Sequence, residues 1–245
     1  MMDDHAVAAD AAQHAGRALL AMRGQGGAAG DRHADRLLFE RLRTLRPGDA
    51  ILSEESPDER VRLGRRRVWI IDPLDGTREY GEPSRTDWAV HVALAVDHVP
   101  TAGAVAMPAA GLVLHTGEPP LPPPRRKGPL RIALSRSRPS ELVNRVVTVL
   151  SADPVPMGSA GAKAMAVVQG AADAYVHSGG QYEWDSCAPV AVAAAAGLHV
   201  SRLDGTALRY NRPDPYLPDL LICRPEFAET IIATVSAATG RSASH

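Results

Sequence analysis

The chain is 245 residues long, which is enough to bury one large core or two smaller ones. Its 45% hydrophobic and 22% charged residues are ordinary for a globular protein, and a net charge of −1 argues against nucleic-acid binding, which needs a basic excess. Cys187 and Cys223 have no metal-type spacing and cannot build a disulfide framework. Because the N-terminus is acidic and no long apolar segment follows, the sequence predicts a cytoplasmic protein without a membrane partner.

Two amphipathic helices are predicted at the start of the chain. Apolar residues recur at helical spacing over 3–22 and again over 31–46, where a Pro-Gly pair ends the pattern. The intervening GQGGAAG (24–30) is expected to lack regular structure, since so many glycines favour a flexible backbone. The segment AILSEES (50–56) then predicts a short strand that runs into acidic residues.

An antiparallel meander is predicted next. The segment VWIIDPLDGTREY (68–80) begins as a strongly apolar strand and leads into two aspartates followed by Gly-Thr. In DWAVHVALAV (87–96) bulky residues alternate, which predicts a half-buried strand. Two more strand-like segments, TAGAVAM and LVLHT, follow with turn residues between them, and short turns join antiparallel neighbours.

The segment GEPPLPPPRRKGP (117–129) separates two different patterns. Six of its thirteen residues are proline, which predicts a stiff linker or a long surface loop. Beyond it, strand-like and helical patterns alternate, which favours an α/β half. These patterns are a strand at 130–135, helices at 139–150 and 159–169, a strand at 171–176 and a helix at 186–196. The predicted organisation is an α+β half with an antiparallel sheet and the metal motifs (1–116), the linker or loop (117–129), and an α/β half that completes the metal site and the substrate pocket (130–245).

Five carboxylates follow the predicted strands or begin the last predicted helix. Each has a structural alternative: Glu54 and Glu55 could be solvated turn residues. Asp72 and Asp75 could make Asx-turns, and Asp185 could be the N-cap of its helix. Brought together, however, these acids would repel one another unless a divalent cation neutralised them. Ligands that are all oxygen favour Mg²⁺, which commonly acts on phosphates.

The residues after Asp75 suit a phosphate. Gly76 and Thr77 offer free backbone N–H groups at a predicted helix start, where an anion is favoured. The motifs SEE (53–55), DPLDGT (72–77) and WDSCAPVAVAAAAG (184–197) are similar, in order and separation, to the three signatures of the inositol monophosphatase superfamily. The resemblance spans positions 31–197 and implies a layered αβαβα sugar-phosphatase fold and lithium-inhibited, Mg²⁺-dependent phosphatase activity.

The resemblance also implies a set of metal ligands for two or three Mg²⁺ ions. Glu54, Asp72 and the carbonyl of Leu74 would hold one ion. Asp72, Asp75 and Asp185 would hold the second, so that Asp72 bridges the two. One ion would lower the pKa of a bound water, and the other would steady the leaving oxygen during in-line displacement.

The same resemblance assigns Asp31, Thr77 and Glu54 to catalysis. The acid at Asp31 would pair with the Thr77 hydroxyl, and the pair would orient the attacking water and help to deprotonate it. Asp35 is the competitor for this role, because GQGGAAG replaces the stretch by which the family usually approaches the acid. A phosphoenzyme is not expected, since DPLDGT lacks the DxDxT spacing of the haloacid-type phosphatases.

The substrate is predicted from the second half of the chain. The whole sequence, including NRPDPYLPDLLICRPE near its end, most resembles the CysQ branch of actinobacteria, which hydrolyses 3′-phosphoadenosine 5′-phosphate (PAP). Lys163 aligns with a lysine that PAP phosphatases place near the nucleotide, although a solvated helix lysine is the alternative. Arg136 and Arg138 suit a phosphate or a solvated loop. The expected substrate-binding residues are Asp75, Gly76, Thr77, Ser135, Arg136, Arg138, Ser159, Lys163 and Asp185.

The sequence therefore predicts a Mg²⁺-dependent phosphatase that converts PAP to AMP and supports sulfate assimilation. A broader enzyme that accepts inositol-1-phosphate and fructose-1,6-bisphosphate is one alternative, and Ser178, where inositol monophosphatases often carry a sugar-binding Glu, weakens the inositol reading. An inactive pseudophosphatase that binds metal or nucleotide is the other, and Thr77 argues against it because a pure binder needs no water-activating pair. The family resemblance implies a homodimer.

Overall fold

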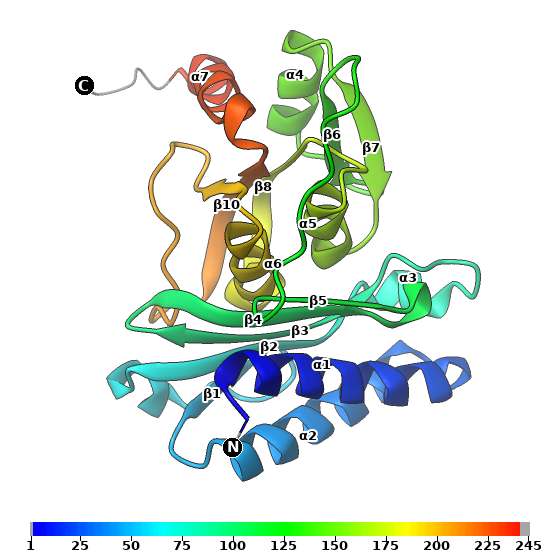
Figure 1. The fold of residues 1–245 in the computed structure, drawn as a ribbon, viewed down its shortest axis with the longest axis vertical. Helices are drawn as coiled ribbons and strands as arrows, with labels where there is room; N and C mark the ends of the chain where they lie inside the picture. Colours follow the sequence, from blue (N-terminus) through cyan, green and yellow to red (C-terminus); the bar gives the residue numbers. More distant parts are fainter. Residues whose placement is uncertain (1, 241–245) are drawn as a thin grey trace.

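Helices and sheets alternate in five layers in the computed structural model, which describes residues 2–240 (Figure 1). The helices are α1 (Asp4–Ala21), α2 (Gly27–Leu45), α3 (Thr77–Gly81), α4 (Glu141–Val149), α5 (Ala160–Val168), α6 (Glu183–Ala195) and α7 (Ala228–Thr239). From one end to the other the layers are α1 with α2, a first sheet, α5 with α6, a second sheet, and α4 with α7. This order confirms the predicted αβαβα fold class.

The first sheet is built from the N-terminal half. Its strands are β1 (Ala50–Ser53), β2 (Arg67–Asp75), β3 (Ala89–Val96), β4 (Val99–Met107) and β5 (Leu112–His115). They lie in the order β1-β2-β3-β4-β5, with β1 parallel to β2 and every other pair antiparallel. The predicted meander is therefore present, with the strand after α2 added at its edge.

Strand β3 was predicted to be half-buried, and this is wrong. It is the central strand of the first sheet, and helices cover both of its faces. Ala89 and Ala93 pack toward α5 and α6, whereas Val90 and Val92 pack toward α1 and α2. The alternation in the sequence is thus one of small and large apolar side chains, not of buried and solvated ones.

The second sheet is mixed, although the alternation of patterns favoured an α/β half. Its strands are β6 (Arg131–Ser135), β7 (Asp153–Met157), β8 (Ala174–Tyr182), β9 (His199–Ser201) and β10 (Tyr216–Cys223). They lie in the order β7-β6-β8-β10-β9. Strand β6 is parallel to β7 and β8, whereas β10 runs antiparallel to β8 and β9. The antiparallel direction of β10 is therefore a feature that the alternation of strand and helix patterns does not indicate.

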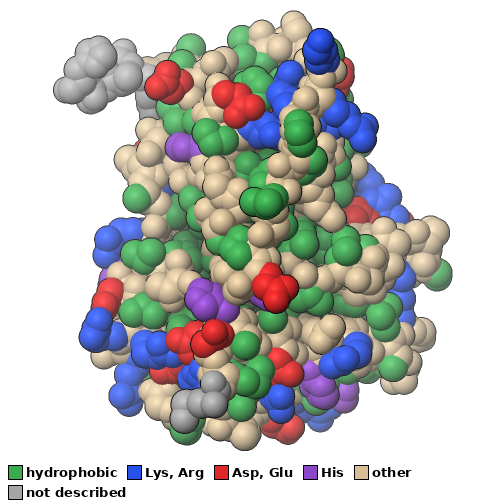
Figure 2. Space-filling view, in the orientation of Figure 1, with side chains coloured by type: hydrophobic (Ala, Val, Ile, Leu, Met, Phe, Trp, Pro, Cys, Tyr) green, Lys and Arg blue, Asp and Glu red, His purple; other side chains and the backbone are tan. Residues whose placement is uncertain are grey.

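Three apolar cores lie between the five layers. In strand β2, Trp69 and Ile71 face the core beneath α1 and α2, while Val68 and Ile70 face the central core against α5 and α6. A third core joins the second sheet to α4 and α7. Acidic and basic side chains are interspersed over the lower part of the face in Figure 2, in keeping with the small net charge. No helix within residues 2–240 is both long enough and apolar enough to cross a membrane.

Two helices begin earlier than predicted. Helix α6 starts at Glu183 instead of residue 186, and α2 starts at Gly27 inside the glycine-rich segment instead of at Asp31. A Cβ on Gly27 would overlap Cγ2 of Thr77, so the glycine lets α2 approach α3 closely. The glycine run therefore serves helix packing next to Thr77, and the expectation that it lacks regular structure is corrected.

The Pro-rich segment 117–129 contains no helix or strand but is held against the second half. Arg224 donates a hydrogen bond of 2.6 Å to the carbonyl of Pro123. The guanidinium of Arg125 lies 5.0 Å from the ring centroid of Phe227. These contacts hold the segment against the second half of the chain.

Candidate functional site

The two aspartates of DPLDGT lie at the end of β2, where a β-bulge turns both toward one face. Side chains alternate along a strand, so residues three apart would normally face opposite sides. Here the pairing with β3 shifts by one residue, and Asp72 lies opposite His91 while Asp75 lies opposite Ala89. The extra residue brings Asp75 to the face of Asp72. Pro73, which cannot donate to the strand ladder, lies within the bulge.

Asp185 joins the two aspartates from the first turn of α6. One carboxylate oxygen from each of Asp72, Asp75 and Asp185 lies within 4.8 Å of the other two. Asp185 is not the N-cap of α6, which was the structural alternative, because Tyr182 holds that position. Asp185 still caps the helix, since its carboxylate accepts the backbone N–H of Tyr182 at 2.7 Å. The side chain therefore caps the helix and faces the cluster at the same time.

Asp72 also makes the local bond expected of a turn. Its Oδ1 accepts the N–H of Leu74 at 3.0 Å, while its Oδ2 is buried and has no hydrogen-bond partner within residues 2–240. The carboxylate of Glu54, directly after β1, lies close enough to Asp72 and Asp75 for their charges to interact, although the residue as a whole is exposed. The carbonyl of Leu74 accepts the Thr77 hydroxyl at 3.2 Å. Asp72 therefore makes the turn-type hydrogen bond with one oxygen and keeps its other, buried oxygen available for a ligand.

The cluster is electrostatically costly without a cation. Burial, together with the charges of Glu54 and Asp75, raises the pKa of Asp72 well above its ordinary value. Burial and the Asp75 charge raise the pKa of Asp185 to about 7. An unpartnered buried oxygen and an all-oxygen donor set are what a hard divalent cation requires. The residues present therefore fit a metal ion such as Mg²⁺.

Asp75 is held more firmly than the other acids. It accepts backbone N–H groups of Ala160 at 3.1 Å and Gly161 at 2.6 Å, both in the first turn of α5. Its Oδ2 also lies 3.1 Å from Nε2 of His91. Burial alone would raise the pKa of Asp75, but the His91 charge and the Gly161 N–H outweigh it and hold the pKa below its ordinary value. Asp75 therefore stays ionised.

The acid proposed to partner Thr77 lies on α2. Asp35 accepts hydrogen bonds from the hydroxyls of Ser53 at 2.6 Å and Ser56 at 2.7 Å, so both of its oxygens are engaged. Asp31 is buried, and its Oδ1 has no hydrogen-bond partner in the part of the chain that the structure describes. Burial and nearby carboxylates raise the pKa of Asp31 to about 7, and the nearby Thr77 side chain partly opposes this rise. Asp31 as the partner of Thr77 stays a prediction, and Asp35, its competitor, is engaged by two serine hydroxyls.

Gly76 and Ser159 bring the two halves of the chain together beside the acids. Gly76 has φ 87° and caps α3, so Thr77 begins that helix. A Cβ on Gly76 would lie 2.9 Å from Cβ of Ser159, the N-cap of α5. The backbone of DPLDGT and the N-terminus of α5 therefore form one continuous surface next to the cluster.

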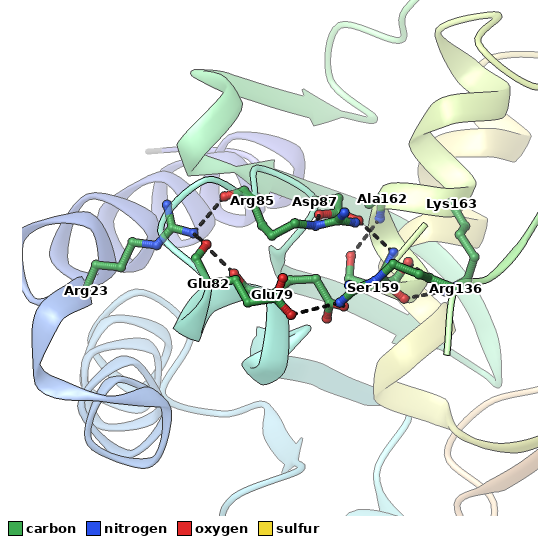
Figure 3. A network of polar contacts seen from close by, with 10 residues as sticks. Arg23, Glu79, Glu82, Arg85, Asp87, Arg136, Ser159, Ala162 and Lys163 are labelled. Carbon is green, nitrogen blue, oxygen red and sulfur yellow. Dashed lines mark hydrogen bonds and ion pairs between the residues drawn. The ribbon is translucent and has the colours of Figure 1, made fainter. Parts of the chain in front are cut away.

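Lys163 is not solvated, so the alternative of a surface helix lysine is wrong. Its side chain is buried, and its Nζ donates to the carbonyls of Gly158 at 2.7 Å and Ser159 at 2.9 Å (Figure 3). The ammonium also lies 5.4 Å from the ring centroid of Tyr175. Burial lowers the pKa of Lys163, although the nearby Asp75 and Asp185 charges oppose that effect.

The arginine loop after β6 lies across from α3. Arg136 donates to Glu79 at 2.6 Å and to Glu82 at 3.0 Å, which links the two halves of the molecule (Figure 3). Arg138 is exposed, and its backbone N–H donates to the hydroxyl of Ser135 at 3.2 Å. Of the two predicted arginines, Arg136 is therefore paired with carboxylates and Arg138 faces solvent.

Several residues of this site escaped the sequence analysis. His91 is buried between the acids, and it was recognisable as a lone polar residue in an apolar strand. Glu183 is buried and accepts the N–H groups of Asn211 at 2.6 Å and Arg212 at 2.8 Å. Asp87 accepts the N–H of Gly158 at 2.7 Å. The sequence carries no signal for the last two, because their partners lie far away along the chain.

Comparisons with known proteins agree with this geometry. A family model described as the Inositol monophosphatase family matches residues 27–239. A 3′-phosphoadenosine 5′-phosphate phosphatase of Mycobacterium bovis is 53% identical over 221 residues, covering 86% of this chain and 82% of that protein. The Mycobacterium leprae protein of the same name is 50% identical over 254 residues, covering 96% and 94%.

The solved structures show the same fold. The crystal structure of CysQ from Bacteroides thetaiotaomicron matches with a TM-score of 0.76 at 24% identity, covering 89% of this chain and 96% of that one. The five-layer order, the three motifs and the carboxylate cluster occur together in this chain. Because the family model matches residues 27–239, which is most of the chain, the chain belongs to the inositol monophosphatase family.

Proposed function

We propose that this chain is a Mg²⁺-dependent phosphatase that removes the 3′-phosphate of PAP, giving AMP and phosphate, in sulfate assimilation. The observation that carries the proposal is the convergence of Asp72, Asp75 and Asp185 beside the Gly76–Thr77 turn. The names of the relatives at 50% and 53% identity support PAP as the substrate. A protein that only bound nucleotide or metal would have no use for the Thr77 hydroxyl next to a buried acid.

The metal ligands in this proposal come from both halves of the chain. Asp72, Asp75 and Asp185 would hold two or three Mg²⁺ ions, together with Glu54 and the carbonyl of Leu74. Bound Mg²⁺ supplies positive charge that stabilises the phosphoryl oxygens and makes water more acidic. Because Asp75 is held by α5 and Asp185 by its own helix cap, two of the ligands are already oriented before an ion binds.

Thr77 and Asp31 would orient and deprotonate the attacking water. The Thr77 hydroxyl would orient the water, and Asp31 would accept the proton that it loses. A pKa raised to about 7 suits Asp31 for this role, because a general base works best when its pKa is near the working pH. The backbone N–H groups of Gly76 and Thr77 would bind the phosphate that is cleaved.

The second phosphate of PAP would be met by the basic residues beyond the linker loop. Lys163 has three N–H donors and uses two on carbonyls, which leaves one for a ligand. Arg138 offers an exposed guanidinium from the loop after β6, and Ser135 is the last residue of that strand. Arg136 and Ser159 lie near each other in Figure 3. The proposal is therefore that the 5′-phosphate lies between the start of α5 and this loop.

Phosphate release tests the function directly. PAP, inositol-1-phosphate and fructose-1,6-bisphosphate would be compared side by side with Mg²⁺, and we expect the highest kcat/KM for PAP. We also expect inhibition by millimolar lithium and no turnover in the presence of EDTA. A preference for inositol-1-phosphate would overturn the PAP assignment, and indifference to both lithium and EDTA would contradict the metal chemistry.

Replacing Lys163 tests the second-phosphate contact. Lys163→Met keeps the aliphatic stem but removes the charge, so PAP binding should lose about 1.5–3 kcal/mol, the usual worth of a hydrogen bond to a charged group. The loss should be much smaller for inositol-1-phosphate, which has one phosphate. The measurement is KM and kcat/KM for both substrates. Equal losses on both would mean that Lys163 instead supports the shared site through the Gly158 and Ser159 carbonyls.

We also propose that the protein acts in the cytoplasm as a homodimer. Both cysteines, Cys187 and Cys223, are free and buried, which suits a reducing compartment. The family resemblance supports the dimer. Sedimentation of the purified protein measures the oligomeric state, and a monomer at micromolar concentration would contradict this part of the proposal.

A further inference from the structure

His91 is a buried histidine at the metal centre that the reaction described above does not use. It is the one polar residue among the eight of β3, and its side chain has no exposed surface. It lies opposite Asp72 in the sheet and on the same face as Ala89 and Ala93, which pack toward α5 and α6. A polar ring in this position would be costly without hydrogen-bond partners.

The partners of His91 are parts of the carboxylate cluster. Its Nε2 lies 3.1 Å from Oδ2 of Asp75, and its Nδ1 lies 3.1 Å from the carbonyl oxygen of Trp184. Nδ1 is also 3.9 Å from Oδ2 of Asp72. Trp184 directly precedes Asp185, so the ring joins the strand that carries two of the acids to the helix turn that carries the third. The carbonyl oxygen of Trp184 accepts a hydrogen bond from Nδ1, whereas Nε2 meets the Asp75 carboxylate as a close charge contact and has no hydrogen-bond partner among residues 2–240.

The neighbouring helix is shaped to admit this ring. A Cβ on Gly161 would overlap Nε2 of His91, so the first turn of α5 can lie here only because residue 161 is glycine. The N–H of Gly161 donates to Oδ2 of Asp75 at 2.6 Å, the same oxygen that faces His91. Asp75 Oδ2 is thus fixed from two sides, by the helix and by the imidazole.

We propose that His91 is a positioning residue of the metal centre, which fixes the Asp75 carboxylate and the Trp184 carbonyl so that Asp75 and Asp185 meet a divalent cation in a preset arrangement. Partners of this kind, one step removed from the ion, typically account for 10- to 100-fold in metal affinity. This role rests on the proposed function in one respect, namely that the cluster binds a divalent cation. It does not depend on which phosphate ester is hydrolysed.

Three substitutions separate the two contacts of the ring. His91→Gln places an amide N–H near the position of Nε2 and keeps the contact with Asp75. His91→Asn places one near Nδ1 and keeps the contact with the Trp184 carbonyl. His91→Leu removes both. His98→Asn is the matched control, because His98 also contacts a backbone carbonyl, that of Tyr210 at 2.7 Å, but lies in the turn after β3, away from the acids.

The readout is metal binding without substrate. Dissociation constants for Mg²⁺ and Mn²⁺ would be measured by calorimetry, and melting temperatures in EDTA and in excess Mg²⁺. We expect His91→Leu to bind at least one ion roughly 10- to 100-fold more weakly, and His91→Gln to recover more of the affinity than His91→Asn. The rise in melting temperature on adding Mg²⁺ should shrink in the same order, and His98→Asn should match the wild type.

Two results would overturn the proposal. If the melting temperatures of the variants fall by the same amount with and without metal, and their dissociation constants match the wild type, His91 only fills the core. If His91→Leu binds metal more tightly, the ring competes with the ion for the acids instead of orienting them. Wild-type protein that binds Mg²⁺ but releases no phosphate from PAP would refute the proposed function and leave the role of His91 standing.

Discussion

Asp185→Asn is expected to lower kcat for PAP by roughly 10³-fold or more while the protein remains folded, because a metal ligand that stabilises the transition state by several kcal/mol is lost. Asparagine has the same shape and can still accept the N–H of Tyr182, so the helix cap is preserved. The affinity for Mg²⁺ should fall as well. The measurements are kcat and KM at several Mg²⁺ concentrations and a metal titration by calorimetry.

The same substitution should leave the metal-free protein as stable as the wild type, or more stable. The folded state raises the pKa of Asp185 from its ordinary value of 3.8 to about 7, so its charged form is disfavoured at neutral pH. An acid with a raised pKa lowers the stability of the folded state as the pH rises from about 4 to 7. Removing the charge removes that penalty, and the melting temperature in EDTA at pH 8 should not fall.

Asp185→Ala is the matched comparison for the capping role. It removes both the charge and the cap, and losing a cap costs about 1 kcal/mol of stability. Asp204→Asn, on the exposed loop before β10, controls for the loss of a carboxylate elsewhere. Near-normal turnover by Asp185→Asn at modest Mg²⁺ would contradict its assignment as a ligand and leave helix capping as its role.

The convergence of three acids could be expected from the sequence, because each lies at the end of an element that the sequence marks clearly. Asp72 and Asp75 end β2, Asp185 lies in the first turn of α6, and the fold brings these ends together. The bulge that turns Asp75 to the face of Asp72 could not be predicted, since it depends on the pairing with β3. The burial of Lys163 likewise depends on tertiary packing, since its ammonium lies over the ring of Tyr175 on β8.

Some of the elements that could not be predicted have local signals that are weak or oppose their structure. Strand β7 reads DPVPM, and two prolines argue against a strand unless it lies at a sheet edge, as this one does. Strand β9 has three residues, too few for a pattern. The start of α2 at Gly27 was hidden by glycines that serve a contact with Thr77. In each case the tertiary partner, which is distant in sequence, decides the local structure.

Thr77→Ala is expected to lower kcat by roughly 10²- to 10⁴-fold with a much smaller change in KM, because the hydroxyl orients the water in the transition state and adds little to substrate binding. Thr77→Ser is the control. It keeps the hydroxyl and loses only Cγ2, the atom that lies against Gly27, so it should retain most of the activity. Loss of activity in the serine variant would mean that packing between α2 and α3 matters more than the hydroxyl.

The two candidate partners of Thr77 should separate cleanly in the same assay. Asp31→Asn should lose activity to a similar extent as Thr77→Ala, and combining the two changes should cost little more than either alone, since they act as one unit. Asp35→Asn should instead lower the melting temperature, because an amide can accept only one of the two serine hydroxyls that Asp35 now accepts. If Asp35→Asn abolishes turnover in a folded protein while Asp31→Asn does not, then Asp35 is the acid that serves the water. The contacts with Ser53 and Ser56 would then belong to the resting arrangement alone, and the unpartnered Oδ1 of Asp31 would need another explanation, such as a direct contact with a metal ion.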